Sequence, residues 1–192
     1  INAALFVAAA WLLNPLAFAL SVPALVAVCF YSLTKRFTSW SHLYLGLAIG
    51  ISPVGAWIAA RGGFGSEAIL LCLALLLWIA GFDIIYSTQD EEFDRRAGLH
   101  SMAVRLGRAG ALRLSAWLHL ACLAVLVLIE RMHGLGWPYR VSLVAVALLL
   151  LWLHRFRRSD SLDGIGQDFF VGNVAVSSCV FAGITASVFL SP

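Results

Sequence analysis

The acidic residues of this sequence are concentrated in one short segment, residues 81–94, which ends a long apolar run. If a helix continued through the segment, Asp83, Tyr86, Asp90 and Asp94 would project within about 80° of one another. Asp90 and Asp94 stand four residues apart, where like charges destabilise a helix. A divalent cation would offset that repulsion. Magnesium fits because it prefers oxygen ligands and combines one or two carboxylates with substrate phosphates.

The same segment also fits a simpler interpretation. Its carboxylates would then lie on a solvated helix at the membrane boundary and pair with Arg95, Arg96 and Arg105. Structural ion pairs cluster charges as functional sites do, so the spacing alone leaves both interpretations open. A calcium loop is a poor match, because the acidic spacing does not follow the EF-hand pattern.

Lys35 is a single lysine in a chain with 13 basic residues, and it follows Tyr31 by four positions. On a helix the two side chains would share a face, so the ammonium group could bind a phosphate oxygen beside an aromatic ring. The alternative is a topology anchor with an interfacial tyrosine, which is common at membrane boundaries.

The composition indicates that lipid surrounds most of the chain. Charged residues make up 12% of the sequence and hydrophobic residues 61%, whereas a soluble domain carries about 25% charged residues. The basic residues do not form a nucleic-acid patch. The four cysteines are widely separated within apolar runs, which favours packing roles over disulfides or a CxxC metal site.

Continuous apolar runs without period-2 alternation predict a bundle of transmembrane helices, not a β-barrel. The uncharged run over residues 1–33 is too long for one helix, and Asn14-Pro15 is its natural break. We therefore expect seven spans, over residues 1–18, 19–34, 41–60, 66–85, 111–130, 137–154 and 168–190.

The connections between these spans differ in charge. Ten basic residues fall on one side and three on the other, which makes the first side cytoplasmic by the positive-inside rule. The N-terminus would then start at the cytoplasmic face and Pro192 would lie outside. The cytoplasmic set is Lys35, Arg36, Arg95, Arg96, Arg105, Arg108, Arg113, Arg155, Arg157 and Arg158, and the other is Arg61, Arg131 and Arg140. Most carboxylates share the cytoplasmic side, with Asp160, Asp163 and Asp168 on its last connection.

Taken together, these motifs resemble the UbiA superfamily of intramembrane prenyltransferases. The resemblance rests on Asp83-x-x-Tyr86-x-x-x-Asp90-x-x-x-Asp94, followed by Gly98-Leu-His100-Ser101 and Arg105-Leu-Gly107. Tyr31-x-x-x-Lys35-Arg36-Phe-Thr38 and Phe169-Phe170-x-x-Asn173 add to it. The similarity covers essentially the whole chain. Its details are closest to the 4-hydroxybenzoate polyprenyltransferase group, particularly a bacterial branch assigned to the futalosine route to menaquinone.

The chain departs from the family pattern in two ways. The first aspartate-rich motif of the family does not occur here, and this chain supplies seven of the family's nine helices. We therefore expect residues 1–192 to be the C-terminal two-thirds of a single transmembrane domain. The first two helices and half of the magnesium site would be missing, so that this fragment alone would be inactive.

The resemblance implies transfer of a polyprenyl group from its diphosphate to an aromatic acid, with magnesium as cofactor, in the bacterial inner membrane with the site loops cytoplasmic. Asp90 and Asp94 would hold the metal, and Lys35 and Arg36 would bind the diphosphate. Tyr31 and Tyr86 would face the allylic cation formed from the donor. Asp83 would support the residues that hold the metal, or polarise the phenol group of the aromatic acceptor. His100, Ser101 and Arg105 would contact the acceptor or support the loop, and Asn173 would hydrogen-bond between helices. No protein partner is implied.

The acceptor expected in quinone biosynthesis is 4-hydroxybenzoate, with a dihydroxynaphthoate for menaquinone as the alternative. From another class, an ion-coupled transporter would carry ionisable residues near the bilayer midplane. Here nearly all carboxylates lie at one face, and the middle of the last three expected helices is almost purely apolar. A non-catalytic scaffold subunit is a third possibility.

Overall fold

The computed structural model describes the backbone of residues 1–155 and 162–190 and the side chains of residues 1–155 and 170–190. Arg157, Arg158 and Asp160, with the side chains of Asp163, Asp168 and Phe169, lie outside this description. Within it the chain is helical and has no strand, which confirms the all-α prediction. The helices are α1 (Asn2–Leu13), α2 (Pro15–Thr34), α3 (Ser41–Gly50), α4 (Ser52–Arg61), α5 (Ser66–Ser87), α6 (Glu91–Arg96), α7 (Met102–His133), α8 (Trp137–Arg155) and α9 (Leu162–Leu190).

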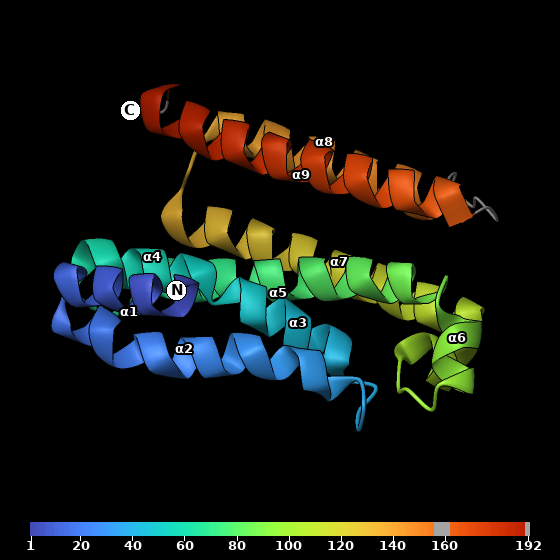
Figure 1. Ribbon diagram of the computed structural model, residues 1–192. Coiled ribbons are helices and arrows are strands. Elements are labelled where there is room, and N and C mark those ends of the chain that lie inside the picture. Colours follow the sequence, from blue (N-terminus) through green and yellow to red (C-terminus); the bar gives the residue numbers. More distant parts are fainter. Residues whose placement is uncertain (156–161, 191–192) are drawn as a thin grey trace.

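Six segments of the described chain are long and apolar enough to cross a membrane: α2, the α3–α4 pair, α5, α7, α8 and residues 170–190 of α9. The chain is therefore a multi-pass membrane protein. The bounds expected for the first span, residues 1–18, are wrong at their C-terminal end, because α1 ends at Leu13. In Figure 1 the N-terminus lies partway along the bundle, not at the end that carries α6.

The predicted break at Asn14-Pro15 is present, although the two helices are 2–13 and 15–34 instead of 1–18 and 19–34. Asn14 is the N-cap of α2, and its side-chain oxygen accepts a hydrogen bond from the Ala17 N–H at 2.8 Å. Its side-chain amide donates to the Ile58 carbonyl at 2.8 Å and so ties this turn to α4. Pro15 suits the first helical position because its missing N–H would have no partner there.

The run expected as one helix over residues 41–60 is divided into α3 and α4 at Ile51. Pro53 explains the division, because it has no N–H to donate to Ile49 and its ring crowds that carbonyl. Together, α3 and α4 still cover the expected length, and the segment Ser41–Arg61 is long and apolar enough to cross a membrane once.

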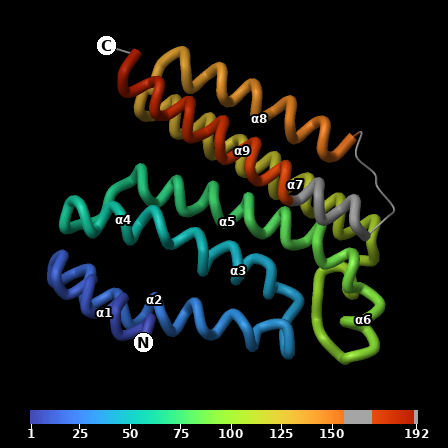
Figure 2. The backbone as a smooth tube through the Cα atoms, turned by 45° about the horizontal axis from the view of Figure 1, so that its top comes forward, coloured from blue at the N-terminus to red at the C-terminus, as the bar shows by residue number. Residues whose placement is uncertain are grey.

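The long helices lie side by side, and the short α6 lies at one end of them, next to the connection between α2 and α3 (Figures 1 and 2). The starts of α3 and α7 and the ends of α2, α5 and α8 reach this same end. Lys35, Arg36, Arg95 and Arg96 therefore gather at one end of the bundle, as the charge pattern predicts.

Helix α3 packs on α5 through two glycines. A Cβ atom at Gly46 would overlap the backbone carbonyl of Leu76, and a Cβ at Gly50 would lie 2.9 Å from the backbone oxygen of Cys72. Small residues four positions apart allow membrane helices to approach this closely. His42 lies one helical turn before Gly46, on the same face of α3, so the glycine contact sets its distance from α5.

Helices α8 and α9 pack on each other and form a separate layer in Figure 1. Hydrogen bonds between side chains join this layer to the rest, one of them from Arg140 Nε of α8 to Glu130 Oε1 of α7 at 2.6 Å. The Trp78 indole N–H of α5 donates to the Asn173 side-chain oxygen at 2.7 Å, which confirms Asn173 as a hydrogen-bonding residue between helices. His119 Nδ1 lies 2.8 Å from His154 Nε2. His119 is the ionisable exception in the almost purely apolar middle of α7, and it is 1% exposed.

Candidate active site

The acidic segment is not one continuous helix, so the predicted common face for its four polar side chains is wrong. Helix α5 ends at Ser87, and the backbone N–H groups of residues 88–90 make tight bonds to carbonyls three residues earlier. Asp90 is then the N-cap residue of α6. Residues 91, 92 and 94 supply carboxylates to the first turn of α6, where the helix dipole favours negative charge. This local preference ends α5 and starts a new helix.

Asp94 is a buried carboxylate, 1% exposed, and Lys35 is its partner. The Lys35 ammonium donates to Asp94 Oδ1 at 3.0 Å. The second oxygen, Oδ2, lies 2.8 Å from the same nitrogen and has no directed hydrogen bond, so this contact is an ion pair. The backbone N–H of His100 donates to the Lys35 carbonyl at 2.8 Å, which holds the loop after α6 against the end of α2. Two segments that the sequence analysis treated as separate motifs therefore form one site.

The neighbouring acids of α6 behave differently. Glu91 pairs with Arg95 at 2.7 Å, and Glu92 pairs with Arg96, each four residues apart on the surface. Exposed pairs of this kind contribute only a few tenths of a kcal/mol. The simpler interpretation, in which the carboxylates pair with nearby arginines, therefore holds for the two glutamates. Asp94 instead turns inward to a lysine from another helix.

These residues fit one side of a magnesium–phosphate site. Asp94 presents carboxylate oxygens in a buried position, and Asp90, half-buried, lies one helical turn before it. Oxygen donors of this kind suit magnesium, which completes its shell with water and phosphate oxygens. Among the described residues no three His, Cys, Asp or Glu side chains come together as a metal site. The chain thus supplies two candidate carboxylates and not a closed cage.

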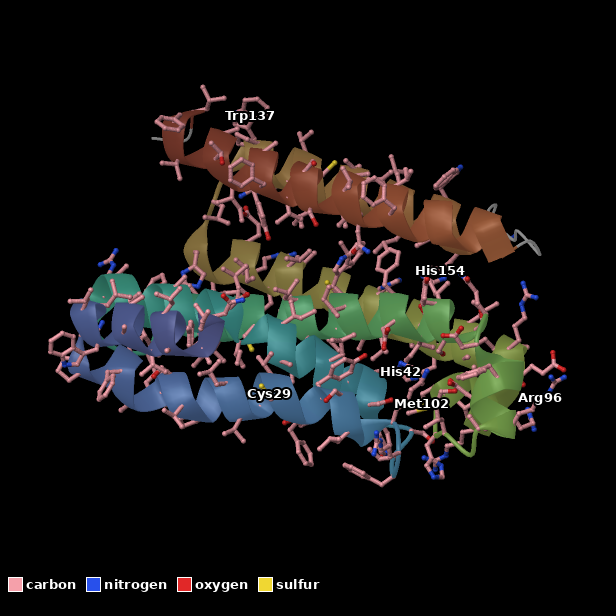
Figure 3. The ribbon with its side chains drawn as sticks, viewed as in Figure 1. Cys29, His42, Arg96, Met102, Trp137 and His154 are labelled. Atoms are coloured by element: carbon pink, nitrogen blue, oxygen red, sulfur yellow. The ribbon has the colours of Figure 1, made fainter. Side chains whose placement is uncertain are left out.

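Asp83 lies on the last turns of α5, where its side chain is 25% exposed. Its Oδ2 is 2.6 Å from His42 Nδ1 on α3. The other ring nitrogen of His42, Nε2, accepts a hydrogen bond from the backbone N–H of Met102 at 3.1 Å (Figure 3). Asp83 is thereby connected to α3 directly and to the start of α7 through His42.

The remaining predicted residues differ in how far they are buried. Tyr31 is half-buried, Tyr86 is 44% exposed, and Arg36 lies exposed beside Lys35. Ser101 is fully buried and is the N-cap of α7, where its oxygen accepts from the Val104 N–H at 3.2 Å. Ser101 therefore supports the loop, in line with one of the two roles considered for it. His100 and Arg105 have exposed side chains.

His42 is the residue that the sequence analysis missed. It is 2% exposed and bonded through both ring nitrogens, but it lies in an otherwise apolar run and outside the motifs named above. The signal was available, because an ionisable residue inside a membrane span is expensive unless it has a partner.

The chain matches the model of the UbiA prenyltransferase family over residues 1–174. It is also similar to a solved structure, described as the apo structure of a UbiA homolog from Aeropyrum pernix K1. That match has a TM-score of 0.85 and 33% sequence identity, and covers 97% of this chain and 69% of the other.

The chain is also similar to curated proteins that are named as 4-hydroxybenzoate prenyltransferases. A 4-hydroxybenzoate octaprenyltransferase of Methylobacillus flagellatus is 32% identical over 179 residues, which are 91% of this chain and 58% of the relative. A mitochondrial 4-hydroxybenzoate polyprenyltransferase of Arabidopsis thaliana is 32% identical over 174 residues, 90% of this chain and 42% of the relative. The chain therefore spans less than two thirds of the length of these relatives.

Proposed function

Because this chain belongs to the UbiA prenyltransferase family, we propose that it is part of an enzyme that transfers a polyprenyl group from its diphosphate to 4-hydroxybenzoate in quinone biosynthesis. The proposal includes magnesium dependence, a bacterial inner-membrane location and a site that opens to the cytoplasm. Its main support is the ion pair of Lys35 with buried Asp94, which sets a carboxylate and a cation beside each other at one end of a lipid-embedded bundle.

In the proposed reaction, Lys35 and Arg36 bind oxygens of the diphosphate and stabilise the negative charge that develops as the carbon–oxygen bond breaks. Asp90 and Asp94 would hold magnesium, which neutralises diphosphate charge when it is bound. Tyr31 and Tyr86 offer aromatic faces to the allylic cation.

Asp83 has a different part in the proposal. Its carboxylate would accept a hydrogen bond from the phenol of the acceptor and increase the electron density of the ring. The ring carbon then attacks the allylic carbon, and the displaced ring proton passes to a base. Ser101 and the backbone of His100 hold the loop that closes this end of the site.

The distribution of ionisable groups favours an enzyme over an ion-coupled transporter. In the described part of the chain, five carboxylates lie at the end of the bundle that carries α6, and two lie at the opposite end. The five are Asp83, Asp90, Glu91, Glu92 and Asp94, and the two are Glu67 and Glu130. His119, which is buried in the bundle, is hydrogen-bonded to His154 in the last turn of α8, and its other ring nitrogen lies 3.3 Å from the Trp78 carbonyl oxygen.

An assay of the purified full-length protein in liposomes tests the proposal. The donor is a short prenyl diphosphate, and the two acceptors are 4-hydroxybenzoate and a dihydroxynaphthoate, each with magnesium or with EDTA. We expect metal-dependent prenylation of 4-hydroxybenzoate. Prenylation of the dihydroxynaphthoate alone would move the protein to menaquinone synthesis, and no product with either acceptor would contradict an enzymatic function.

A further inference from the structure

His42 has both ring nitrogens engaged, and its partners determine where its proton lies. A backbone N–H can only donate, so the bond from Met102 requires a lone pair on Nε2. The single proton of the neutral ring must then be on Nδ1, from which it is donated to Asp83 Oδ2 at 2.6 Å. A doubly protonated ring would set an N–H against the Met102 N–H. The geometry therefore selects the neutral tautomer that carries its proton on Nδ1.

We propose that His42 is a positioning residue that orients the Asp83 carboxylate for prenyl transfer. This inference rests on the function proposed above and adds a residue to it. A neutral His42 holds Oδ2 by a directed bond and adds no positive charge beside the Asp83 carboxylate. The second oxygen, Oδ1, is left to face a group of the aromatic acceptor.

Three helices make this arrangement rigid. His42 is carried by α3, which the glycine contact presses onto α5. Asp83 belongs to α5, and Met102 begins α7 directly after the buried Ser101 cap. One imidazole thus fixes the distance between the end of α5 and the start of α7. Side chains positioned in this way support reaction geometry, for which a small displacement costs rate.

Two substitutions separate the two bonds of His42. An asparagine amide nitrogen occupies nearly the place of Nδ1, so His42→Asn keeps the donor to Asp83 and loses the acceptor for Met102. A glutamine side chain reaches the place of Nε2, so His42→Gln keeps an acceptor for Met102 and loses the donor to Asp83. His133→Gln, at the far end of α7, is the matched control.

The kinetic test uses the full protein in liposomes. We expect His42→Gln to lower kcat by about 10- to 100-fold, with little change in the KM for prenyl diphosphate. We expect His42→Asn and His133→Gln to stay near wild-type kcat. The proposal is overturned if the Asn and Gln variants lose equal activity, if both retain it, or if the Asn variant is the weaker one.

A second measurement does not depend on turnover. Nitrogen-15 NMR of protein labelled at histidine reports which ring nitrogen carries the proton, with the His42→Asn spectrum assigning the signal. We expect a neutral His42 protonated on Nδ1, and protonation on Nε2 would overturn the proposal. If wild-type protein prenylates neither acceptor, the proposed function fails, and the NMR result still judges the His42–Asp83 bond by itself.

Discussion

The Lys35 ammonium nitrogen lies 3.0 Å and 2.8 Å from the two carboxylate oxygens of Asp94, 59 residues further along the chain. Asp94 is 1% exposed and the Lys35 side chain 33%. The pair joins the end of α2 to α6, so the position of the acidic helix depends on a residue from another segment. An isolated charge at the Asp94 position would cost free energy. Substitution of either residue is therefore expected to lower both the activity and the stability of the protein.

Replacement of Asp94 tests its role in the reaction. We expect Asp94→Asn to lower prenyl transfer by at least ~10²-fold, because the amide keeps the shape of the side chain and removes its charge. Asp90→Ala should have an effect in the same direction. Chromatography of the prenylated product measures the loss, and detergent-extracted yield shows that the variants still insert.

Glu92→Gln is the control for this prediction, because Glu92 lies on the same short helix with a side chain that is 78% exposed. Its activity should remain within about twofold of wild type, since exposed ion pairs contribute little. Equal losses in the Asp94 and Glu92 variants would remove the special role of Asp94.

Lys35→Met tests the stability of the ion pair. It leaves Asp94 buried without a cation, and we expect a loss of about 2–3 kcal/mol in the free energy of unfolding. Thermal unfolding in detergent measures this loss. The double variant Lys35→Met/Asp94→Asn should recover part of it, because no charge is then left buried. A double variant less stable than the single one would contradict the pairing.

Gly46→Ala tests the contact of α3 with α5. The added methyl group would meet the Leu76 backbone carbonyl, which cannot move aside like a side chain. We expect a loss of about 1–3 kcal/mol in the free energy of unfolding, together with reduced activity, because His42 lies on the same face of α3.

Gly55→Ala in α4 is the matched control, because nothing lies within 4 Å of a Cβ at that position. Alanine favours helix over glycine by roughly 0.5–1 kcal/mol, so this variant should unfold at the same temperature as wild type or slightly higher. Equal destabilisation by both substitutions would show that the α3 contact is not special.

Single-cysteine labelling tests the orientation in the membrane. In a background without the four native cysteines, Glu92→Cys on α6 and Phe64→Cys in the α4–α5 connection report the two ends of the bundle. The positive-inside rule predicts that an impermeant maleimide labels Phe64→Cys in right-side-out vesicles, and Glu92→Cys only after permeabilisation. The opposite pattern would place the proposed site outside.

Much of the fold follows from composition and proline placement. A chain with 12% charge has to bury its backbone polar groups in helices within lipid, and the break at Asn14-Pro15 is present. The exact bounds of the helices on either side could not be foreseen in the same way. An uncharged run shows that a segment tolerates lipid, but not at which residue one helix ends and the next begins.

The residues of the candidate site can be named from the sequence, whereas their contacts cannot. Asp94 and Lys35 were identified from motifs, whereas their pairing depends on how α2 meets α6. The assumption of a continuous acidic helix failed because the N-terminal preference for acids favours a new helix after Asp90. His42 was missed because its partners, Asp83 and the Met102 backbone, are 41 and 60 residues away.

The glycine contact between α3 and α5 has a consequence for how these helices can evolve. At Gly46 and Gly50 the opposing surface is the backbone of Cys72 and Leu76, which every amino acid supplies alike. Positions 46 and 50 are therefore confined to very small residues, while positions 72 and 76 are free to drift. Methods that infer contacts from paired changes between homologues should be blind to this contact, although it brings His42 to Asp83.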